Sequence, residues 1–149
     1  PTGPSDIRRV EAGILNWGAD MTLENNLYEV GLDHLVDESK SADYIGGAAL
    51  KRIKAEGVKR KLAGIEIEGP RIEMNAAPWP VAAGGETIGR VTSAVYSPRL
   101  EKNIGYAMLP SAKAMAGTAL QVRVPGVGAR RATVVPKPFI DPRKEIPKA

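Results

Sequence analysis

The pattern of apolar and polar positions predicts that the chain begins with a helix. Ile7, Val10 and Ile14 recur at the spacing of one helical face. Ser5 precedes them and is a suitable N-cap, because its hydroxyl can accept a hydrogen bond from one of the first free backbone N–H groups. The spacing therefore predicts a helix over about residues 6–15.

The period of the pattern changes after this helix. Apolar and polar residues alternate over about residues 28–36, which predicts a short strand with His34 half-buried in it. Residues 48–56 return to a helical spacing, and Gly57 is a suitable end for that second helix. One strand and two helices cannot readily complete a sheet and cover both of its faces, so we expect residues 1–58 to belong to a longer fold.

From residue 59 onward the pattern is that of short strands separated by glycine, proline, asparagine and serine. We expect strands near residues 62–67, 79–83, 87–95, 103–109, 118–124 and 130–136. Regular short strands with no long helix between them are typical of a closed or sandwiched antiparallel sheet. The chain is therefore predicted to be α+β, with a proline-rich tail, residues 136–147, extended along the surface.

Composition removes several kinds of chemistry. The 149 residues include no cysteine and a single histidine, His34, which excludes disulfides and thiolate nucleophiles and disfavours a metal centre, so we expect no metal ligand. No apolar run approaches the roughly 18 residues of a membrane span, and the first residues lack the pattern of an export signal. We therefore expect a cytoplasmic protein with no membrane partner.

Charge is unevenly distributed along the chain. The net charge is +4, but residues 1–45 carry three basic and nine acidic side chains, whereas residues 46–149 carry eighteen basic and eight acidic ones. The basic part suits an anionic ligand, nucleic acid or the acidic face of another part of a larger protein. Six basic residues lie close together: Lys51, Arg52, Lys54, Lys59, Arg60 and Lys61. No aromatic residue lies among them, so nucleic-acid binding through residues 46–61 is the weaker hypothesis and we expect no nucleic-acid partner.

The first predicted helix carries the candidate binding chemistry. Arg9 and Asn16 share a face of it, and Gly13 leaves open surface between them. Such a face can present a guanidinium and an amide to a ligand, while Trp17 supplies a flat stacking surface. The alternative is an ordinary surface helix with Trp17 packed into a core. Glu11 points to a different side from Arg9, and no spacing in the chain selects a nucleophile or a general base.

Several short motifs lie at residues 9–14, 17–21, 29–32, 44–50, 88–93, 97–100, 103–107 and 132–139. Their order resembles that of the aminomethyltransferase family, the T-protein of the glycine cleavage system. Each motif alone is weak, but in this order, over nearly the whole chain, they resemble that family specifically. The family is much longer than this chain. The resemblance therefore implies that the chain corresponds to its C-terminal part, with residues 1–58 ending the folate-binding region and residues 59–149 forming an antiparallel β-barrel domain.

The resemblance also implies a function. Members of the family transfer a one-carbon unit from a small-molecule donor to tetrahydrofolate, with folate N5 as the acceptor and no metal. Their catalytic aspartate lies upstream of the region that this chain resembles. We therefore expect no catalytic residue here, an inactive fragment, and an N-terminal folate-binding half as its partner. The resemblance implies these folate- or substrate-binding residues: Arg9, Glu11, Asn16, Trp17, Arg60, Lys61 and Arg143.

Two alternatives stay open. Ser5 stands where aminomethyltransferases usually carry an arginine, and residues 4–9 and 20–26 look more like the demethylase branch, which includes dimethylsulfoniopropionate demethylase. The donor therefore carries either an aminomethyl or a methyl group. The alternative from another class is a non-catalytic β-barrel module, either of a larger folate-linked oxidoreductase acting on sarcosine or dimethylglycine or as a structural partner chain.

Overall fold

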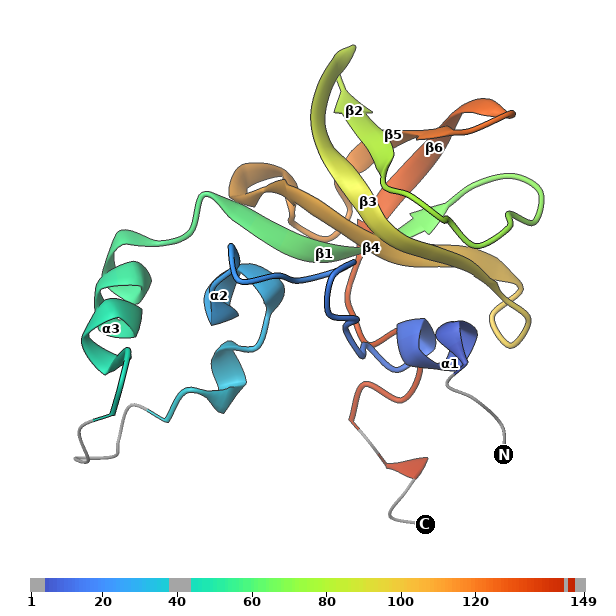
Figure 1. Cartoon of the computed structure of the whole chain (residues 1–149). Helices are drawn as coiled ribbons and strands as arrows, with labels where there is room; N and C mark the ends of the chain where they lie inside the picture. Colours follow the sequence, from blue (N-terminus) through green and yellow to red (C-terminus); the bar gives the residue numbers. More distant parts are fainter. Residues whose placement is uncertain (1–4, 38–43, 144, 147–149) are drawn as a thin grey trace.

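Six strands close into a barrel in the computed structural model, which describes residues 5–37, 44–143 and 145–146 (Figure 1). Neighbouring strands are antiparallel and follow the order β1-β4-β3-β2-β5-β6, and the pairing of β6 with β1 closes the ring. The strands are β1 (Arg60–Ile67), β2 (Trp79–Ala83), β3 (Glu86–Ser97), β4 (Lys102–Pro110), β5 (Ala119–Val124) and β6 (Gly128–Val135). The six strands predicted from the sequence are confirmed, and their antiparallel sheet is closed rather than sandwiched.

The barrel interior is a continuous apolar core. Along β5 exposed and buried residues alternate, so that Leu120 and Val122 face inward. Side chains from the other strands fill the same core, among them Ile65, Val81, Val91 and Val134, all of which are fully buried or nearly so. Because side chains of a strand point alternately to its two faces, this core produces the period of two seen in the sequence.

Strand β4 is buried on both of its faces. Every residue from Asn103 to Leu109 is buried, since the inner face meets the barrel core and the outer face is covered. Outside the barrel wall, Ile104, Tyr106 and Met108 form a second apolar cluster with residues that precede the barrel, Val10 and Val30 among them. The N-terminal part of the chain is therefore fixed to the outside of β4.

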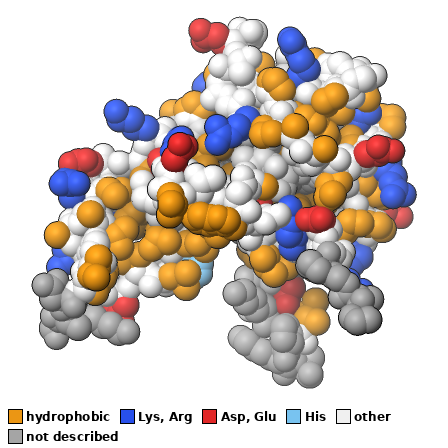
Figure 2. Space-filling view, in the orientation of Figure 1, with side chains coloured by type: hydrophobic (Ala, Val, Ile, Leu, Met, Phe, Trp, Pro, Cys, Tyr) orange, Lys and Arg blue, Asp and Glu red, His pale blue; other side chains and the backbone are white. Residues whose placement is uncertain are grey.

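The helical elements lie mostly before the barrel. They are α1 (Asp6–Glu11), α2 (Leu27–Val30), the 3-10 turn η1 (Asp33–Leu35) and α3 (Gly47–Glu56), with one further 3-10 turn, η2 (Ser111–Lys113), between β4 and β5. We call residues 5–37 and 44–59 the front segment. It lies along one side of the barrel, and Figure 2 shows hydrophobic side chains gathered on the viewed face where α2 and α3 lie. Among the residues described, no helix is long and apolar enough to cross a membrane.

The first helix is shorter than the sequence predicts. The second predicted helix is confirmed as α3, which ends at Gly57, but α1 stops at Glu11 rather than near residue 15. Gly13 has a φ of +75°, a left-handed value that an α-helix does not tolerate. The chain therefore leaves the helix before Asn16, and Arg9 and Asn16 do not share a helical face.

The strand predicted near residues 28–36 is wrong. Asn26 and Glu29 form a capping box, in which each side chain accepts a hydrogen bond from the other residue's backbone N–H. Gly31, with a φ of +78°, ends the short helix α2, and η1 follows. These local caps override the alternating pattern, and His34 is an exposed residue of η1 instead of a half-buried strand residue.

The tail after β6 is only partly the surface segment that the prolines predict. The backbone N–H groups of Phe139 and Ile140 both donate to the carbonyl oxygen of Glu11 at 3.0 Å. The Phe139 ring stacks against Tyr106, with 6.1 Å between the ring centroids. Residues 137–141 are accordingly half-buried, and Phe139 packs against the second apolar cluster. Residues 144 and 147 of the predicted tail lie outside the described residues.

Candidate functional site

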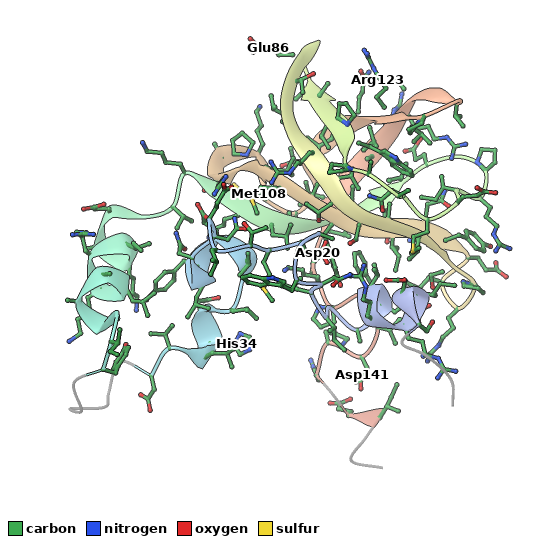
Figure 3. The ribbon with its side chains drawn as sticks, viewed as in Figure 1. Asp20, His34, Glu86, Met108, Arg123 and Asp141 are labelled. Carbon is green, nitrogen blue, oxygen red and sulfur yellow. The ribbon has the colours of Figure 1, made fainter. Side chains whose placement is uncertain are left out.

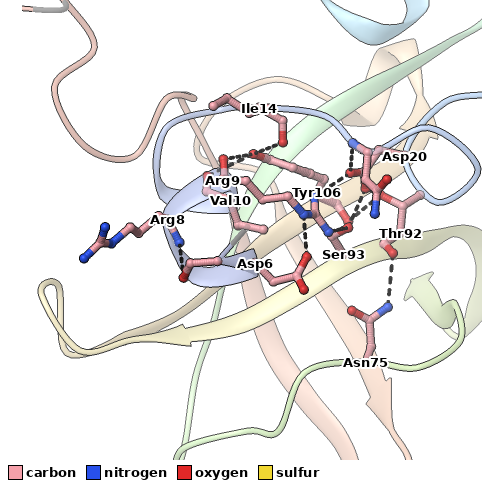
Figure 4. Close-up of polar contacts among 12 residues, drawn as sticks. Asp6, Arg8, Arg9, Val10, Ile14, Asp20, Asn75, Thr92, Ser93 and Tyr106 are labelled. Carbon is pink, nitrogen blue, oxygen red and sulfur yellow. Dashed lines mark hydrogen bonds and ion pairs between the residues drawn. The ribbon is translucent and has the colours of Figure 1, made fainter. Parts of the chain in front are cut away.

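A buried carboxylate, Asp20, joins the front segment to the barrel (Figures 3 and 4). Its Oδ1 accepts hydrogen bonds from the hydroxyls of Thr92 and Ser93, both at 2.6 Å. Its Oδ2 accepts from the backbone N–H of Asn16 at 2.8 Å and from Nη1 of Arg9 at 2.9 Å. Asp20 is only 2% exposed, so these four donors replace the water that the carboxylate loses. We call these five residues the Asp20 clamp.

A bulge in β3 allows two consecutive hydroxyls to reach one carboxylate oxygen. Successive side chains of a regular strand point to opposite faces, so Thr92 and Ser93 would ordinarily diverge. The register of β3 against β4 shifts between Val91 and Ser93, and such a bulge re-aims the side chains at that point. The site residues predicted from the sequence do not include Asp20, Thr92 and Ser93, although these three lie in the family-like motifs at residues 17–21 and 88–93. The two adjacent hydroxyl residues inside a predicted strand were a further signal for this place.

The Arg9 side chain points into the molecule, where hydrogen bonds to three other residues hold its guanidinium. Besides the bond to Asp20, its Nε donates to Asp6 at 2.6 Å and its Nη2 donates to Ser93 at 3.0 Å. Burial disfavours the charged guanidinium, but the hydrogen bond to Asp6 and the charges of Asp20 and Asp6 outweigh it and raise the pKa of Arg9. The guanidinium therefore bonds within α1 through Nε and ties α1 to Asp20 through Nη1 and to Ser93 of β3 through Nη2.

Glu11 has a similar internal position at the end of α1. It is buried, and one of its carboxylate oxygens accepts a hydrogen bond from the Ser97 hydroxyl at 2.6 Å. Nearby, the Tyr106 hydroxyl donates to the carbonyl oxygen of Val10 at 2.9 Å, and burial, followed by the negative charge of Asp20, raises the pKa of that hydroxyl. Arg9 and Glu11 thus fasten α1 to the barrel wall from two sides.

The Asp20 clamp fixes a tight turn that displays Trp17. The Asp20 N–H donates to the Asn16 carbonyl oxygen and the Gly18 N–H donates to the Met21 carbonyl oxygen, both at 2.9 Å. The Trp17 side chain projects from this turn and is 61% exposed. Trp17 is therefore not packed into a core, and its indole ring is available on a turn that is anchored at its base.

The other predicted binding residues lie elsewhere. Arg60, at the start of β1, donates from Nε to the Glu29 carboxylate and from Nη2 to the Glu24 carbonyl oxygen, each at 3.0 Å. Lys61 follows it and is exposed. Arg143 lies in the tail, almost fully exposed, with Glu145 at 4.0 Å. The structure thus brings Arg9, Asn16 and Trp17 together around Asp20, while Arg60 and Lys61 lie beside α2.

The Glu29 carboxylate that Arg60 contacts anchors α2. Burial raises its pKa, but hydrogen bonds from Arg60, Asn25 and the Asn26 backbone, with the positive charge of Arg60, outweigh burial and hold the pKa below its ordinary value. The same carboxylate closes the capping box of α2. In the part of the chain that the structure describes, no group of three or more His, Cys, Asp or Glu residues is placed to hold a metal ion.

The barrel and its flanking segment define a known class of domain. Residues 60–141 match the glycine cleavage T-protein C-terminal barrel domain. The aminomethyltransferase T of the glycine cleavage system from Bartonella henselae has the same fold, with a TM-score of 0.81 at 23% identity over 91% of this chain and 37% of that one. The match to the domain covers more than half of the chain, which therefore belongs to the glycine cleavage T-protein family.

Similar proteins within the family are named either as aminomethyltransferases or as a demethylase. The chain is 41% identical over 137 residues to an aminomethyltransferase from Synechococcus, covering 92% of this chain and 37% of the relative. It is 37% identical over 131 residues to a dimethylsulfoniopropionate demethylase from Ruegeria pomeroyi, covering 88% of this chain and 35% of the relative. The chain thus spans little more than a third of the length of these curated relatives.

Removing the carboxylate of the clamp tests its contribution to stability. Asp20→Ala leaves Arg9 and two hydroxyls facing a site without their acceptor, so we expect the free energy of unfolding to fall by about 3 kcal/mol. Urea denaturation followed by circular dichroism measures this loss. Asp33→Ala, which removes an exposed carboxylate of η1, is the matched control and should change stability by less than about 0.5 kcal/mol. Equal stability of Asp20→Ala and the unmodified chain would contradict the role given to the clamp.

The lowered pKa of Glu29 makes the anchoring of α2 dependent on pH. A carboxyl whose pKa is lower in the folded than in the unfolded state stabilises the fold above its ordinary value of 4.5, and this contribution disappears as pH falls through the folded pKa. We therefore expect Glu29→Gln to be less stable than the unmodified chain at pH 7, with the difference shrinking below pH 4.5. Urea denaturation at a series of pH values measures it, and in an Arg60→Met background the difference at pH 7 should be smaller. If the stability difference between Glu29→Gln and the unmodified chain grew toward acid pH, it would contradict a lowered pKa of Glu29 in the folded state.

Proposed function

We propose that the chain is the C-terminal part of a tetrahydrofolate-dependent one-carbon transferase. The observation that carries the proposal is the extent of the likeness to aminomethyltransferases: it covers 92% of the chain, so it includes the front segment as well as the barrel. If the chain shared only the barrel domain with these enzymes, as a non-catalytic module would, the likeness would be expected over residues 60–141 alone. In this proposal residues 1–58 complete a folate-binding region supplied mainly by the N-terminal half, and residues 59–149 are the barrel domain.

The exposed groups of the chain suit a folate. A pterin is a flat ring that stacks well on an aromatic side chain, and Trp17 offers an exposed indole on an anchored turn. The glutamyl tail carries carboxylates, which suit ammonium and guanidinium donors such as the exposed Lys61 and Arg143. Arg60, next to Lys61, would meet such a carboxylate while keeping its bonds to Glu29 and the Glu24 carbonyl oxygen. Asn16, exposed beside Trp17, can add an amide contact.

Two residues of the proposed site would act on folate indirectly, by positioning other groups. Arg9 and Glu11 make their bonds inside the molecule, to Asp20 and Ser97 respectively. In the proposal they are positioning residues, which hold α1 and the turn that carries Trp17 in place. The reacting carboxylate belongs to the N-terminal half, so this chain binds and orients folate and performs no proton transfer of its own.

The donor is a small molecule that carries an aminomethyl or a methyl group. Relatives named for either reaction are similar to this chain over most of its length. Ser5, where an arginine is usual among aminomethyltransferases, accepts the Arg8 N–H as the N-cap of α1 and supplies no positive charge. This favours a donor that needs no cation at that position, such as the sulfonium of the demethylase reaction.

Folate binding by the complete protein tests the proposal. Isothermal titration with tetrahydrofolate should give saturable binding, and Trp17→Ala should weaken it by about tenfold, since stacking on an aromatic side chain is worth roughly 1–3 kcal/mol. The matched control is Met115→Ala, an exposed apolar residue of the loop between β4 and β5. No binding at millimolar tetrahydrofolate would contradict the proposed function, and unchanged affinity in Trp17→Ala would remove Trp17 from the site.

A further inference from the structure

The pairing of β3 with β2 ends where β3 bulges. Trp79, the first residue of β2, lies opposite Val91, and β3 continues past this pair without β2 beside it. On the β4 side the ladder runs on to Ser97, but the register shift leaves Thr92 without a partner residue in β4. Thr92 and Ala94 are buried, so their backbone N–H and C=O groups need partners within the protein.

Asn75, in the connection between β1 and β2, supplies these partners (Figure 4). Its Oδ1 accepts a hydrogen bond from the Ala94 N–H at 2.6 Å, and its Nδ2 donates to the Thr92 carbonyl oxygen at 3.1 Å. The Asn75 backbone N–H donates to the Ala94 carbonyl oxygen at 3.3 Å. A further bond from Nδ2 to the Ala77 carbonyl oxygen, also at 3.1 Å, fixes the orientation of the amide. Asn75 thus takes the place of a neighbouring strand beside the bulge.

The connection that carries Asn75, residues 68–78, is itself anchored to β4. The side chain of Asn103 is buried, and its Oδ1 accepts a hydrogen bond from the Ile72 N–H at 3.0 Å. Its Nδ2 donates to three carbonyl oxygens between residues 67 and 70, at 3.1–3.2 Å. Asn103 therefore fixes the start of the connection, and Asn75 meets β3 from a defined position.

We infer that Asn75 is a positioning residue for the Asp20 clamp, which it reaches through the bulge of β3. The two hydroxyls that donate to Oδ1 of Asp20 belong to Thr92 and Ser93. Consecutive side chains of a regular strand point to opposite faces, so both hydroxyls reach this one oxygen only while the bulge persists. Asn75 bonds to the backbone on either side of Ser93, at Thr92 and Ala94, and so holds the bulge in place.

The effect extends from the clamp to the exposed indole ring. Asp20 accepts the Asn16 N–H at the base of the turn that carries Trp17. When the bulge relaxes, Asp20 loses a hydroxyl donor and the turn loses its anchor. Asn75 thereby sets the position of Trp17, although it belongs to the barrel and not to the front segment. Its influence on folate rests on the proposed function, whereas its influence on the clamp does not.

Hydrogen exchange in Asn75→Ala tests the inference on the 149-residue chain. We expect the protection of the Asn16 and Asp20 amides to fall at least tenfold more than that of the β1–β4 ladder, because the clamp opens while the barrel stays folded. The control is Val122→Ala, which leaves a cavity at a fully buried position of β5. It should lower the protection of clamp and ladder by the same factor. An equal fall in Asn75→Ala would show a contribution to global stability only and would overturn the inference.

Tetrahydrofolate affinity of the complete protein is the second readout. We expect Asn75→Ala to weaken binding severalfold, but to add no further loss in a Trp17→Ala background, because both changes act through the same turn. Additive losses would mean that Asn75 acts by another route and would overturn the inference. Failure of the complete protein to bind folate, with selective loss of clamp protection in Asn75→Ala, refutes the proposed function alone. Folate binding that depends on Trp17, with clamp protection unchanged in Asn75→Ala, refutes the role of Asn75 alone.

Discussion

The whole arrangement depends on one buried charge. Asp20 loses its water on folding, and such a loss is tolerated only when donors from the protein replace it. Those donors come from three places: the helix α1, the turn that begins at Asn16, and the bulge of β3. The carboxylate is satisfied only when all three meet, so it sets the position of the front segment on the barrel more narrowly than the apolar contacts of Val10 and Val30 do.

This constraint explains why a segment with little core of its own is nevertheless held in place. The clamp, the Glu11–Ser97 bond and the tail that returns to Glu11 fix α1, and the Arg60–Glu29 pair fixes α2. These polar contacts all face the barrel. Away from these contacts the segment exposes the large side chains of Trp17, Leu35, Tyr44 and Ile45.

The barrel and α3 could be predicted from the sequence, because an alternating core and a glycine-terminated helix leave direct patterns. The short helix α2 could not be recognised, since its signal is a local capping box at Asn26 and Glu29 that competes with an alternating pattern. The resemblance to the family supplied the candidate residues but not their roles. The inward direction of Arg9 follows from its contacts with Asp20 and Ser93, which depend on how the front segment packs on β3, and the bulge that re-aims Ser93 depends on pairing with β4.

Hydrogen exchange of single amides tests the central claim most directly. The Asn16 amide donates to Asp20 and the Asp20 amide donates back to the Asn16 carbonyl oxygen. If the clamp locks the front segment to the barrel, these two amides exchange only when the whole structure unfolds, with the same opening free energy as the amides of the β3–β4 ladder. Rapid exchange of both amides while the ladder remains protected would show that the segment opens on its own, and would contradict the account.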